Sequence, residues 1–227
     1  MAEVTTDIAK PTSRLPKRLG SWYFRGYNFT PDVVFDVGVF DGTTWLYNSF
    51  PDAKFVLIDP QAKSRDKVTD KLKNFDFHAV ALGDTEGEVT LRIPETKPGR
   101  GGAMASILPR ADRTANQFNS IQEVTVPIQT LDSIAADYDG RIGLKIDTEG
   151  YEAQVLAGAT KTLKRTDFVV AEVSVAKRFE GVSQPSTLFA RLAEAGLEFR
   201  DVLAAATYPG RRPRPQNMDL LFTRWGQ

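Results

Sequence analysis

The sequence has 227 residues, of which 41% are hydrophobic and 26% charged, with 29 basic and 29 acidic side chains. This length suits one α/β domain with a full core. The balanced charge lacks the basic excess of a nucleic-acid-binding protein, so no nucleic-acid partner is expected. Because the chain has no cysteine, disulfides, thiolate metal sites and cysteine nucleophiles are excluded, which fits a reducing cytoplasm.

The ends of the chain and its apolar runs indicate where the protein resides. The N-terminal segment is polar and lacks the apolar centre of a signal peptide. No apolar run approaches the roughly 20 residues that cross a bilayer. We therefore expect a cytoplasmic location and no membrane span, while the oligomeric state is not encoded. We divide the chain into an aromatic N-terminal lead-in over residues 1–30 and one Rossmann-like domain over residues 31–227.

Short apolar runs alternate with amphipathic stretches, as they do in βαβ units. The predicted strands are residues 33–37, 54–58, 77–82, 89–93, 124–128, 142–146, 168–173, 198–204 and 219–223. The predicted helices are residues 62–74, 151–163 and 184–195, with a further helix after the first strand. Apart from Asp36 and Lys145, the strands at 33–37 and 142–146 are apolar on both faces, which predicts a mostly parallel central sheet with helices on both faces. Few periodic apolar residues occur between 95 and 120, and we expect a mobile loop there.

A glycine turn and an acid indicate a nucleoside site. Gly38 and Gly42 lie between the first strand and the next helix, where a ligand that approaches the backbone leaves no room for a side chain. Asp59 ends the second strand, the position from which an acid binds the ribose hydroxyls in doubly wound folds. The alternative is that the glycines only make a tight connection and that Asp59 only starts a turn.

The charge of this turn favours one class of cofactor. Its Gly-x-x-x-Gly spacing is not the dinucleotide motif, and Asp36 and Asp41 lie within or beside it. These carboxylates would repel a pyrophosphate but suit a ligand with a sulfonium and an ammonium group. We therefore predict S-adenosyl-L-methionine as the cofactor.

A second group of charged residues follows the strand at 142–146. Asp147, Glu149 and Glu152 lie at its carboxyl end, where open α/β sheets bind their substrates, and Lys145 precedes them. Dense charge beside buried strands is costly unless it is paired or used. Alternatively, the acids open a helix and Lys145 pairs with one of them. Glu172 is a further acid in an apolar strand, for which a site role is preferred to a buried structural pair.

With these residues in place, the chain resembles the FkbM methyltransferase family from about residue 33 to its end. The matching segments are FDVGVFDGTT, the Asp59-Pro60 pair, HAVALGD, TLDSI, LKIDTEGYEAQVLAGA and VVAEVS. The segment LKIDTEGYE together with VLAGA is the most specific of them. The resemblance implies a class I methyltransferase fold and S-adenosyl-L-methionine as the methyl donor.

The resemblance also implies roles for individual residues. Gly38 and Asp36 would line the methionine part of the cofactor, Asp59 would hold the ribose, Ala81 would flank the adenine, and Asp147 would face the methyl group and the acceptor. The chain departs from the family where Val39-Phe40 replaces the more usual Ala-Asn, and where Asp59 replaces a frequent Glu. The shorter Asp59 keeps the carboxylate that would bind the ribose. Phe40, in contrast, would change how the methionine carboxylate is held.

Methyl transfer to a hydroxyl requires alignment of the reactants and removal of a proton. His78 begins a strand away from the predicted site, so we interpret it as structural. The predicted catalytic residues are Asp147 or Glu149 as the base and Lys145 as an orienting group or, alternatively, a base of lowered pKa. A divalent cation held by Asp147 and Glu149 is a further alternative, although no decisive ligand spacing supports it.

The acceptor is only weakly encoded. The family resemblance implies O-methylation of a small-molecule or glycan acceptor: a sugar, glycolipid or secondary metabolite. We expect the segment 96–113 to recognise it, and Ser106 occupies a position where the family tends to carry a serine. One hypothesis is that a set of arginines attracts an acidic acceptor, and the alternative is that they are solvated loop residues. They are Arg100, Arg110, Arg211, Arg212 and Arg214.

Two other functions remain open at this level. One is a nicotinamide-dependent oxidoreductase, which the incomplete acidic glycine turn and the lack of a Tyr-x-x-x-Lys pair disfavour. The other is a protein that binds the cofactor without catalysis and serves as a partner.

Overall fold

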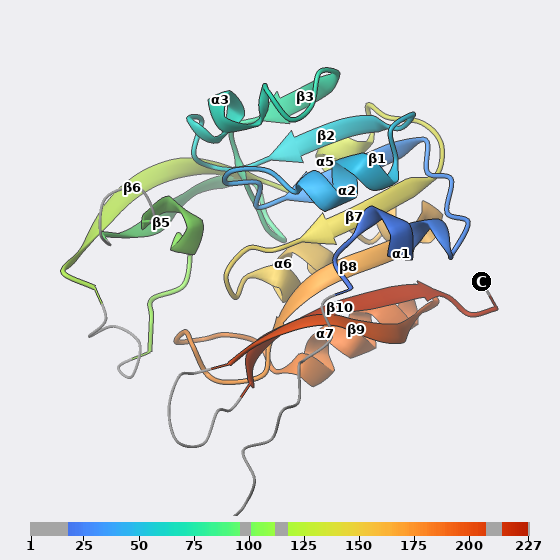
Figure 1. Ribbon diagram of the computed structural model, residues 1–227. Helices are drawn as coiled ribbons and strands as arrows, with labels where there is room; N and C mark the ends of the chain where they lie inside the picture. The colour runs from blue at the N-terminus through green and yellow to red at the C-terminus, as the bar shows by residue number, and fades with distance from the viewer. Residues whose placement is uncertain (1–17, 96–100, 112–117, 208–214, 227) are drawn as a thin grey trace, which may run out of the picture.

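A seven-stranded sheet forms the centre of the molecule (Figure 1). The computed structural model describes residues 18–95, 101–111, 118–207 and 215–226. The strand order is β3-β2-β1-β7-β8-β10-β9. The strands are β1 Val33–Val37, β2 Lys54–Ile58, β3 Phe75–His78, β7 Ile142–Ile146, β8 Thr166–Ser174, β9 Leu197–Thr207 and β10 Pro215–Arg224. Within the sheet, β10 alone runs antiparallel to both neighbours, so the predicted α/β fold with a mostly parallel sheet is confirmed.

Neighbouring residues of β1 pack into two different hydrophobic clusters, because side chains alternate across a strand. Phe35 belongs to a cluster that also contains residues of α5, α6 and α7. Val34 belongs to a cluster that contains residues of α1, α2 and α3. The helices are α1 Ser21–Arg25, α2 Thr44–Ser49, α3 Ser64–Val68, α5 Leu131–Ala135, α6 Glu152–Ala157 and α7 Pro185–Glu194. The continuous apolar runs are therefore explained by burial on both sides of the strands.

A second, smaller sheet extends beside the β2 and β3 edge of the first (Figure 1). It consists of β4 Ala81–Leu82, β5 Gly87–Glu95 and β6 Ser120–Gln129, in the order β4-β6-β5. Its own cluster contains Ala81 and Leu91. Two 3-10 helices complete the described elements: η1 Gly101–Met104 and η2 Thr162–Arg165.

The predicted strand at 77–82 is wrong as a single element. Residues up to His78 pair with β2 in the large sheet, whereas Ala81 pairs with Ile128 in the small one. The chain leaves one sheet for the other at Ala79 and Val80, and a short apolar run does not reveal such a change of partner.

Two predicted helices are shorter than their patterns. The stretch 62–74 is helical only over α3, and the stretch 151–163 divides into α6 and the following turns that lead to η2. Periodicity predicts the buried face, but it places the ends of an element poorly.

The predicted mobile loop is ordered where it is described. Residues 101–111 form η1 and two isolated bridges, Ser106 with Arg92 and Arg110 with Phe179. Backbone hydrogen bonds join Arg92 and Ser106 in both directions, at 2.8 and 3.0 Å. This segment is thus fixed to β5 and to the chain after β8, while 96–100 and 112–117 lie outside the described residues.

The lead-in packs on the sheet through its aromatic residues. Phe24 is fully buried, and its ring lies 5.9 Å from that of Phe168 in β8. The division at residue 30 remains a prediction. None of the described helices is long and apolar enough to cross a membrane.

Candidate active site

The strand order changes direction between β1 and β7. From β1 the chain proceeds to β2 on one side, whereas β7 lies on the other. Open α/β sheets bind ligands in the crevice at the carboxyl ends of such a pair of strands. Gly38 follows β1 and Asp147 follows β7, and within the strands Asp36 pairs in register with Lys145. The predicted glycine turn and the predicted acidic segment therefore meet at one point.

Gly38 is required by its contact with the neighbouring strand end. Its φ is +78°, and a Cβ atom would lie 1.7 Å from the carbonyl oxygen of Asp147. Its N–H donates to Ile58 O at 2.9 Å, and Lys145 Nζ donates to its carbonyl oxygen at 3.1 Å. The sequence correctly indicates a close approach to this backbone, but the approaching group within the described chain is Asp147.

Asp59 holds the glycine turn in place. Its Oδ2 accepts the backbone N–H of Phe40 and its Oδ1 that of Gln61, both at 2.8 Å. The side chain is 3% exposed, and burial raises the pKa of Asp59 against the effect of these two bonds. Phe40 itself has a φ of +45°, which is rare for a residue with a side chain. Asp59 thus fixes an unfavourable turn conformation as well as facing the cavity beside it.

A cavity with about 550 Å³ of space, open solvent included, lies beside this turn. Its walls combine the ends of β1, β2 and β4 with the segment that contains η1, and they include Gly38, Asp59 and Ala81. Gln61 Nε2 donates to Gly102 O at 2.9 Å and so ties β2 to η1. Gln61 Oε1 is buried and accepts no hydrogen bond within the described chain. An unsatisfied acceptor in this wall is suited to a ligand with N–H or O–H groups. We call this space the smaller cavity.

A larger and more open cavity of about 1090 Å³ lies on the other side of the glycine turn. The two cavities share the wall residues Gly38, Phe40, Ala103 and Asp147. The larger one is lined by further charged residues, namely Asp41, Lys145 and Asp219. Asp147 is therefore the one predicted catalytic residue that lines both cavities.

Lys145 is held as an ammonium group. Its Nζ lies 3.3 Å from Asp36 Oδ1 and 3.5 Å from Asp147 Oδ2. Burial lowers the pKa of Lys145, but the charges of Asp36 and Asp147 outweigh burial and keep that pKa above its ordinary value. The suggestion of a lysine base with a lowered pKa is therefore wrong, and the orienting role remains.

Asp36 lies beneath the cavities and lines neither of them. Its side chain is fully buried, with Oδ2 accepting from Tyr47 Oη at 2.8 Å and Oδ1 facing Lys145. The family resemblance implies that Asp36 lines the methionine part of the cofactor, but its side chain lies in the wall of neither cavity. Asp36 therefore positions Lys145 through the ion pair between them. Asp41 is exposed at the rim of the larger cavity, beside Gly42, whose φ is +93°.

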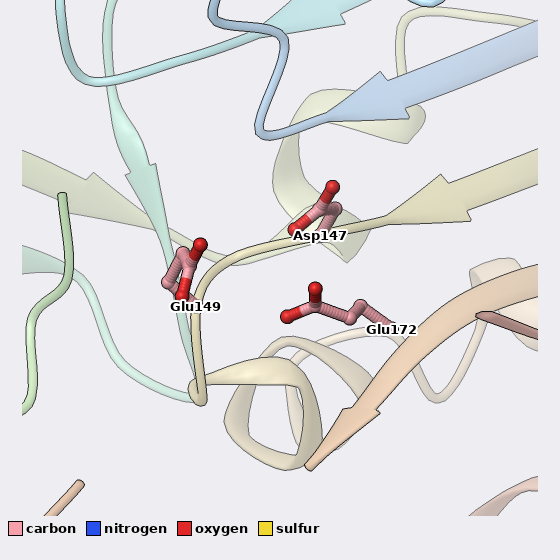
Figure 2. Close-up of side chains that lie close together, drawn as sticks. All are labelled: Asp147, Glu149 and Glu172. Atoms are coloured by element: carbon pink, nitrogen blue, oxygen red, sulfur yellow. The ribbon is translucent and has the colours of Figure 1, made fainter. Parts of the chain in front are cut away.

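Glu149 lies beside the smaller cavity and near Asp147 and Glu172 (Figure 2), in a cluster of acids and arginines. Arg178 donates to Glu149 and, at 3.0 Å, to Glu172 Oε2, while Arg110 Nη2 lies 3.8 Å from Glu149 Oε2. Burial raises the pKa of Glu149 to about 7, although Arg178 opposes this rise. Its φ of +54° is a second unfavourable conformation at the edge of the smaller cavity. Such backbone outliers cluster at functional sites.

This cluster does not fit a divalent cation. Asp147, Glu149 and Glu172 place carboxylate oxygens within 4.8 Å of one another, and in Figure 2 Glu172 extends from β8 toward the loop that carries the other two. Oxygen ligands at this spacing suit a hard cation. However, the Arg178 guanidinium already binds two of the three carboxylates and supplies the positive charge. The reaction proposed for this site involves no metal ion.

Glu152 has a local structural role. Its Oε1 accepts the N–H of Thr148 and of Gly150, both at 3.0 Å, and the hydroxyl of Thr148 at 3.1 Å. These bonds close the loop between β7 and α6. The alternative that Thr148 and Glu149 open a helix is wrong, because α6 begins at Glu152, whereas the ion pair that it gives to Lys145 is present.

The remaining predicted residues fall into two groups. His78 ends β3 and does not begin a strand as predicted, but it bonds Tyr138 at 3.2 Å and lines neither cavity. Ser106 donates to Glu149 O at 2.7 Å in the wall of the smaller cavity. Arg110 is buried against Glu149, so it is not a solvated loop residue. Three arginines proposed to attract an acidic acceptor lie outside the described residues together with Arg100: Arg211, Arg212 and Arg214.

Sequence reasoning missed Arg178 and Asp219. Both lie near the site through the pairing of β8 with β10 and the turn after β8. In the sequence, Asp219 is a charged residue within an apolar strand and Arg178 is a charged residue shortly after one. Neither position identifies the residue's neighbours in the folded chain.

A glycine turn at the switch point, with an acid directly after the next strand, is typical of nucleoside-binding α/β proteins. The family model described as the methyltransferase FkbM domain matches residues 36–208, and the chain belongs to this family. The predicted family is thereby confirmed. The chain matches none of the curated proteins.

The chain is also similar, at low sequence identity, to solved methyltransferase structures. Magnesium protoporphyrin IX methyltransferase from Synechocystis PCC 6803, with bound SAM, is 10% identical, with 90% of this chain and 75% of that chain covered and a TM-score of 0.46. A 1,6-didemethyltoxoflavin-N1-methyltransferase from Burkholderia thailandensis is 12% identical, with 90% and 76% covered and a TM-score of 0.42.

Proposed function

We propose that this chain is an S-adenosyl-L-methionine-dependent methyltransferase, built as one domain, that methylates a hydroxyl group of a sugar, glycolipid or secondary metabolite. The observation that carries the proposal is the position of Asp147, where the two cavities meet at the switch point of a FkbM family fold. One cavity would take the donor and the other the acceptor, so that the reacting groups meet beside Asp147. A cytoplasmic location remains a prediction.

The smaller cavity suits the nucleoside part of the donor. Asp59 ends β2 with a buried carboxylate that is suited to ribose hydroxyls, and Ala81 gives an apolar wall for the adenine. Gln61 Oε1 lacks a hydrogen bond within the described chain and is available to an N–H or O–H donor. Gly38 and Asp147 line the same cavity, so a donor bound there would lie beside Asp147.

The charges around the turn match a cationic ligand better than a diphosphate. Asp147 lines both cavities, Asp41 lies in the glycine turn between them, and Lys145 is neutralised by its ion pairs with Asp36 and Asp147. A pyrophosphate would meet carboxylates here, whereas a sulfonium and an ammonium group would be attracted. When bound, the cofactor supplies an activated methyl group.

The residues of the chain then act mainly by position. In-line transfer depends on alignment of two reactants, and a fixed geometry accelerates it without covalent chemistry by the protein. Lys145 holds Asp147 and the Gly38 carbonyl in one arrangement. Asp147 faces both cavities and would contact the acceptor beside the methyl group. Glu149, which was a candidate base, is bound by Arg178 and lines only the smaller cavity.

The experiment that tests this function is methyl transfer to a metabolite extract. The protein is incubated with methyl-labelled donor and an extract of the cells that carry its gene, and the products are searched by mass spectrometry for the gain of one labelled methyl group. A product with a labelled methyl ether group that is absent with Gly38→Ala protein supports the proposal. Donor binding without any turnover would instead favour a catalytically inactive binding protein.

A further inference from the structure

Three carboxylates occupy neighbouring strand ends at the carboxyl edge of the sheet. Ile146 pairs with Ala171, so the next residues along these parallel strands, Asp147 and Glu172, lie side by side. Glu172 in turn pairs with Asp219 of the antiparallel β10. Asp219 therefore reaches the site from the last strand of the chain, through pairing across the sheet.

The three carboxylates differ in how far they are neutralised. Glu172 accepts from Arg178 at 3.0 Å and also from Asn217. Asp147 is paired with Lys145 at 3.5 Å. The side chain of Asp219 makes neither a hydrogen bond nor an ion pair with any residue that the structure describes. It is thus the carboxylate of the three whose oxygens are left for a ligand.

Asp219 also lies in the right cavity for contact with an acceptor. It lines the larger cavity together with Asp147 and Lys145, whereas Glu149 lines only the smaller one and Glu172 lines neither. An acceptor that fills the larger cavity would therefore lie between Asp147 and Asp219, close to the position where the two cavities join.

The surroundings of Asp219 favour a proton acceptor at neutral pH. Burial raises the pKa of Asp219 to about 6, the charge of Asp147 adds to the rise, and Lys145 opposes it. The other charged group on a packed neighbour is Glu172 of β8, which Arg178 holds, while the β9 neighbour is the uncharged Ala204. A base is most effective when its pKa lies near the working pH.

We propose that Asp219 is the catalytic base, which takes the proton of the acceptor hydroxyl in the larger cavity. This inference rests on the proposed function. As the acceptor oxygen forms its bond to the methyl group, the bond between that methyl and the donor sulfur breaks, and the hydroxyl proton moves to a carboxylate oxygen of Asp219. The donor leaves as a neutral thioether, and Asp219 returns the proton to water. Asp147 aligns the acceptor beside the methyl group.

The test compares Asp219→Asn and Asp219→Glu with the wild type and with Glu198→Gln, which replaces an exposed acid on the neighbouring β9. The assay follows the initial rate of label transfer to the metabolite extract from about pH 5 to about pH 8, and donor affinity is measured separately by calorimetry. Asn at position 219 should lower the rate by about 100-fold, with donor affinity unchanged. The Glu variant should recover part of the rate, and Glu198→Gln should match the wild type.

A direct titration gives a readout that does not depend on turnover. In carbon-13 spectra of protein labelled at its aspartate carboxyl groups, one carboxyl should titrate near pH 6, the value to which burial and Asp147 raise the pKa of Asp219. This signal should vanish in Asp219→Asn, and it should move to lower pH in Asp147→Asn because a neighbouring negative charge is removed. An unchanged rate and pH profile in Asp219→Asn would overturn the inference, even if the wild type binds the donor. Failure of the wild type to bind the donor would instead overturn the proposed function.

Discussion

The smaller and larger cavities meet at Asp147 but are built in different ways. The smaller cavity is shaped largely by backbone: Gly38 is forced by the Asp147 carbonyl, and both oxygens of Asp59 accept backbone N–H groups. The larger cavity is defined by charged side chains, among them Asp219, and it opens more widely. We infer that a rigid backbone frame recognises the donor and that charged side chains recognise the acceptor. Substitutions in the smaller cavity should therefore lower donor affinity, whereas substitutions in the larger cavity should lower turnover.

The largest effect is expected from Gly38→Ala. The new Cβ would lie 1.7 Å from the Asp147 carbonyl at a φ of +78°, so the strand ends would have to separate. We expect loss of donor binding and a fall in unfolding free energy of more than about 4 kcal/mol, measured by calorimetry and denaturant titration. Gly181→Ala is the matched control, because Gly181 has a similar φ of +74° with nothing within 4 Å. Equal losses in the two variants would show that backbone strain, and not the contact with Asp147, requires Gly38.

Asp147→Asn should separate binding from turnover. The amide keeps the shape but loses the charge that pairs with Lys145 at 3.5 Å, so the acceptor would be aligned less well. Turnover with the extract should fall by about 100-fold, while donor affinity changes little. If this variant turns over like the wild type, Asp147 has no part in the reaction.

Asp59→Ala should affect the smaller cavity and therefore donor binding. Two backbone N–H groups, those of Phe40 and Gln61, would lose their acceptor, and the ribose would lose its partner. Donor affinity should weaken by about tenfold or more in calorimetry. Asp70→Ala, which removes an exposed acid, is the control and should leave affinity unchanged. Unaltered donor affinity in Asp59→Ala would remove the nucleoside from the smaller cavity.

The smallest effect concerns the ionic cluster around Glu149. Burial raises the pKa of Glu149 from 4.5 to about 7, so the folded state binds this proton more tightly than the unfolded state does. Its contribution to stability is then greatest below about pH 4.5 and is lost as the pH rises through about 7. Glu149→Gln should flatten the fall in thermal midpoint across this range, whereas Glu198→Gln should keep it. Parallel curves for Glu149→Gln and the wild type would contradict this assignment.

The sequence predicts the parts of the molecule that depend on local pattern. The strands β1, β2 and β7 have the predicted bounds because continuous apolar runs end at turn residues. Gly38 and Asp59 could be found because each follows a strand at a recognisable spacing, and their proximity to Asp147 follows from the parallel order of β1 and β7.

What the sequence leaves open is the choice of partner across the sheet. Nothing within 77–82 shows that the chain changes sheets between His78 and Ala81. Likewise, Asp219 meets the site only because β10 inserts between β8 and β9, and Arg178 only because the turn after β8 folds back on Glu149. These contacts are tertiary, and periodicity within one element carries no information about them.

Calorimetric titration with S-adenosyl-L-methionine and, in parallel, with NAD tests the central claim most directly. The account predicts saturable binding of the methyl donor to the wild type, its loss in Gly38→Ala, and no heat of binding with NAD. Tight binding of NAD without any response to the methyl donor would contradict it, because a diphosphate would then be accommodated beside Asp41 and Asp147.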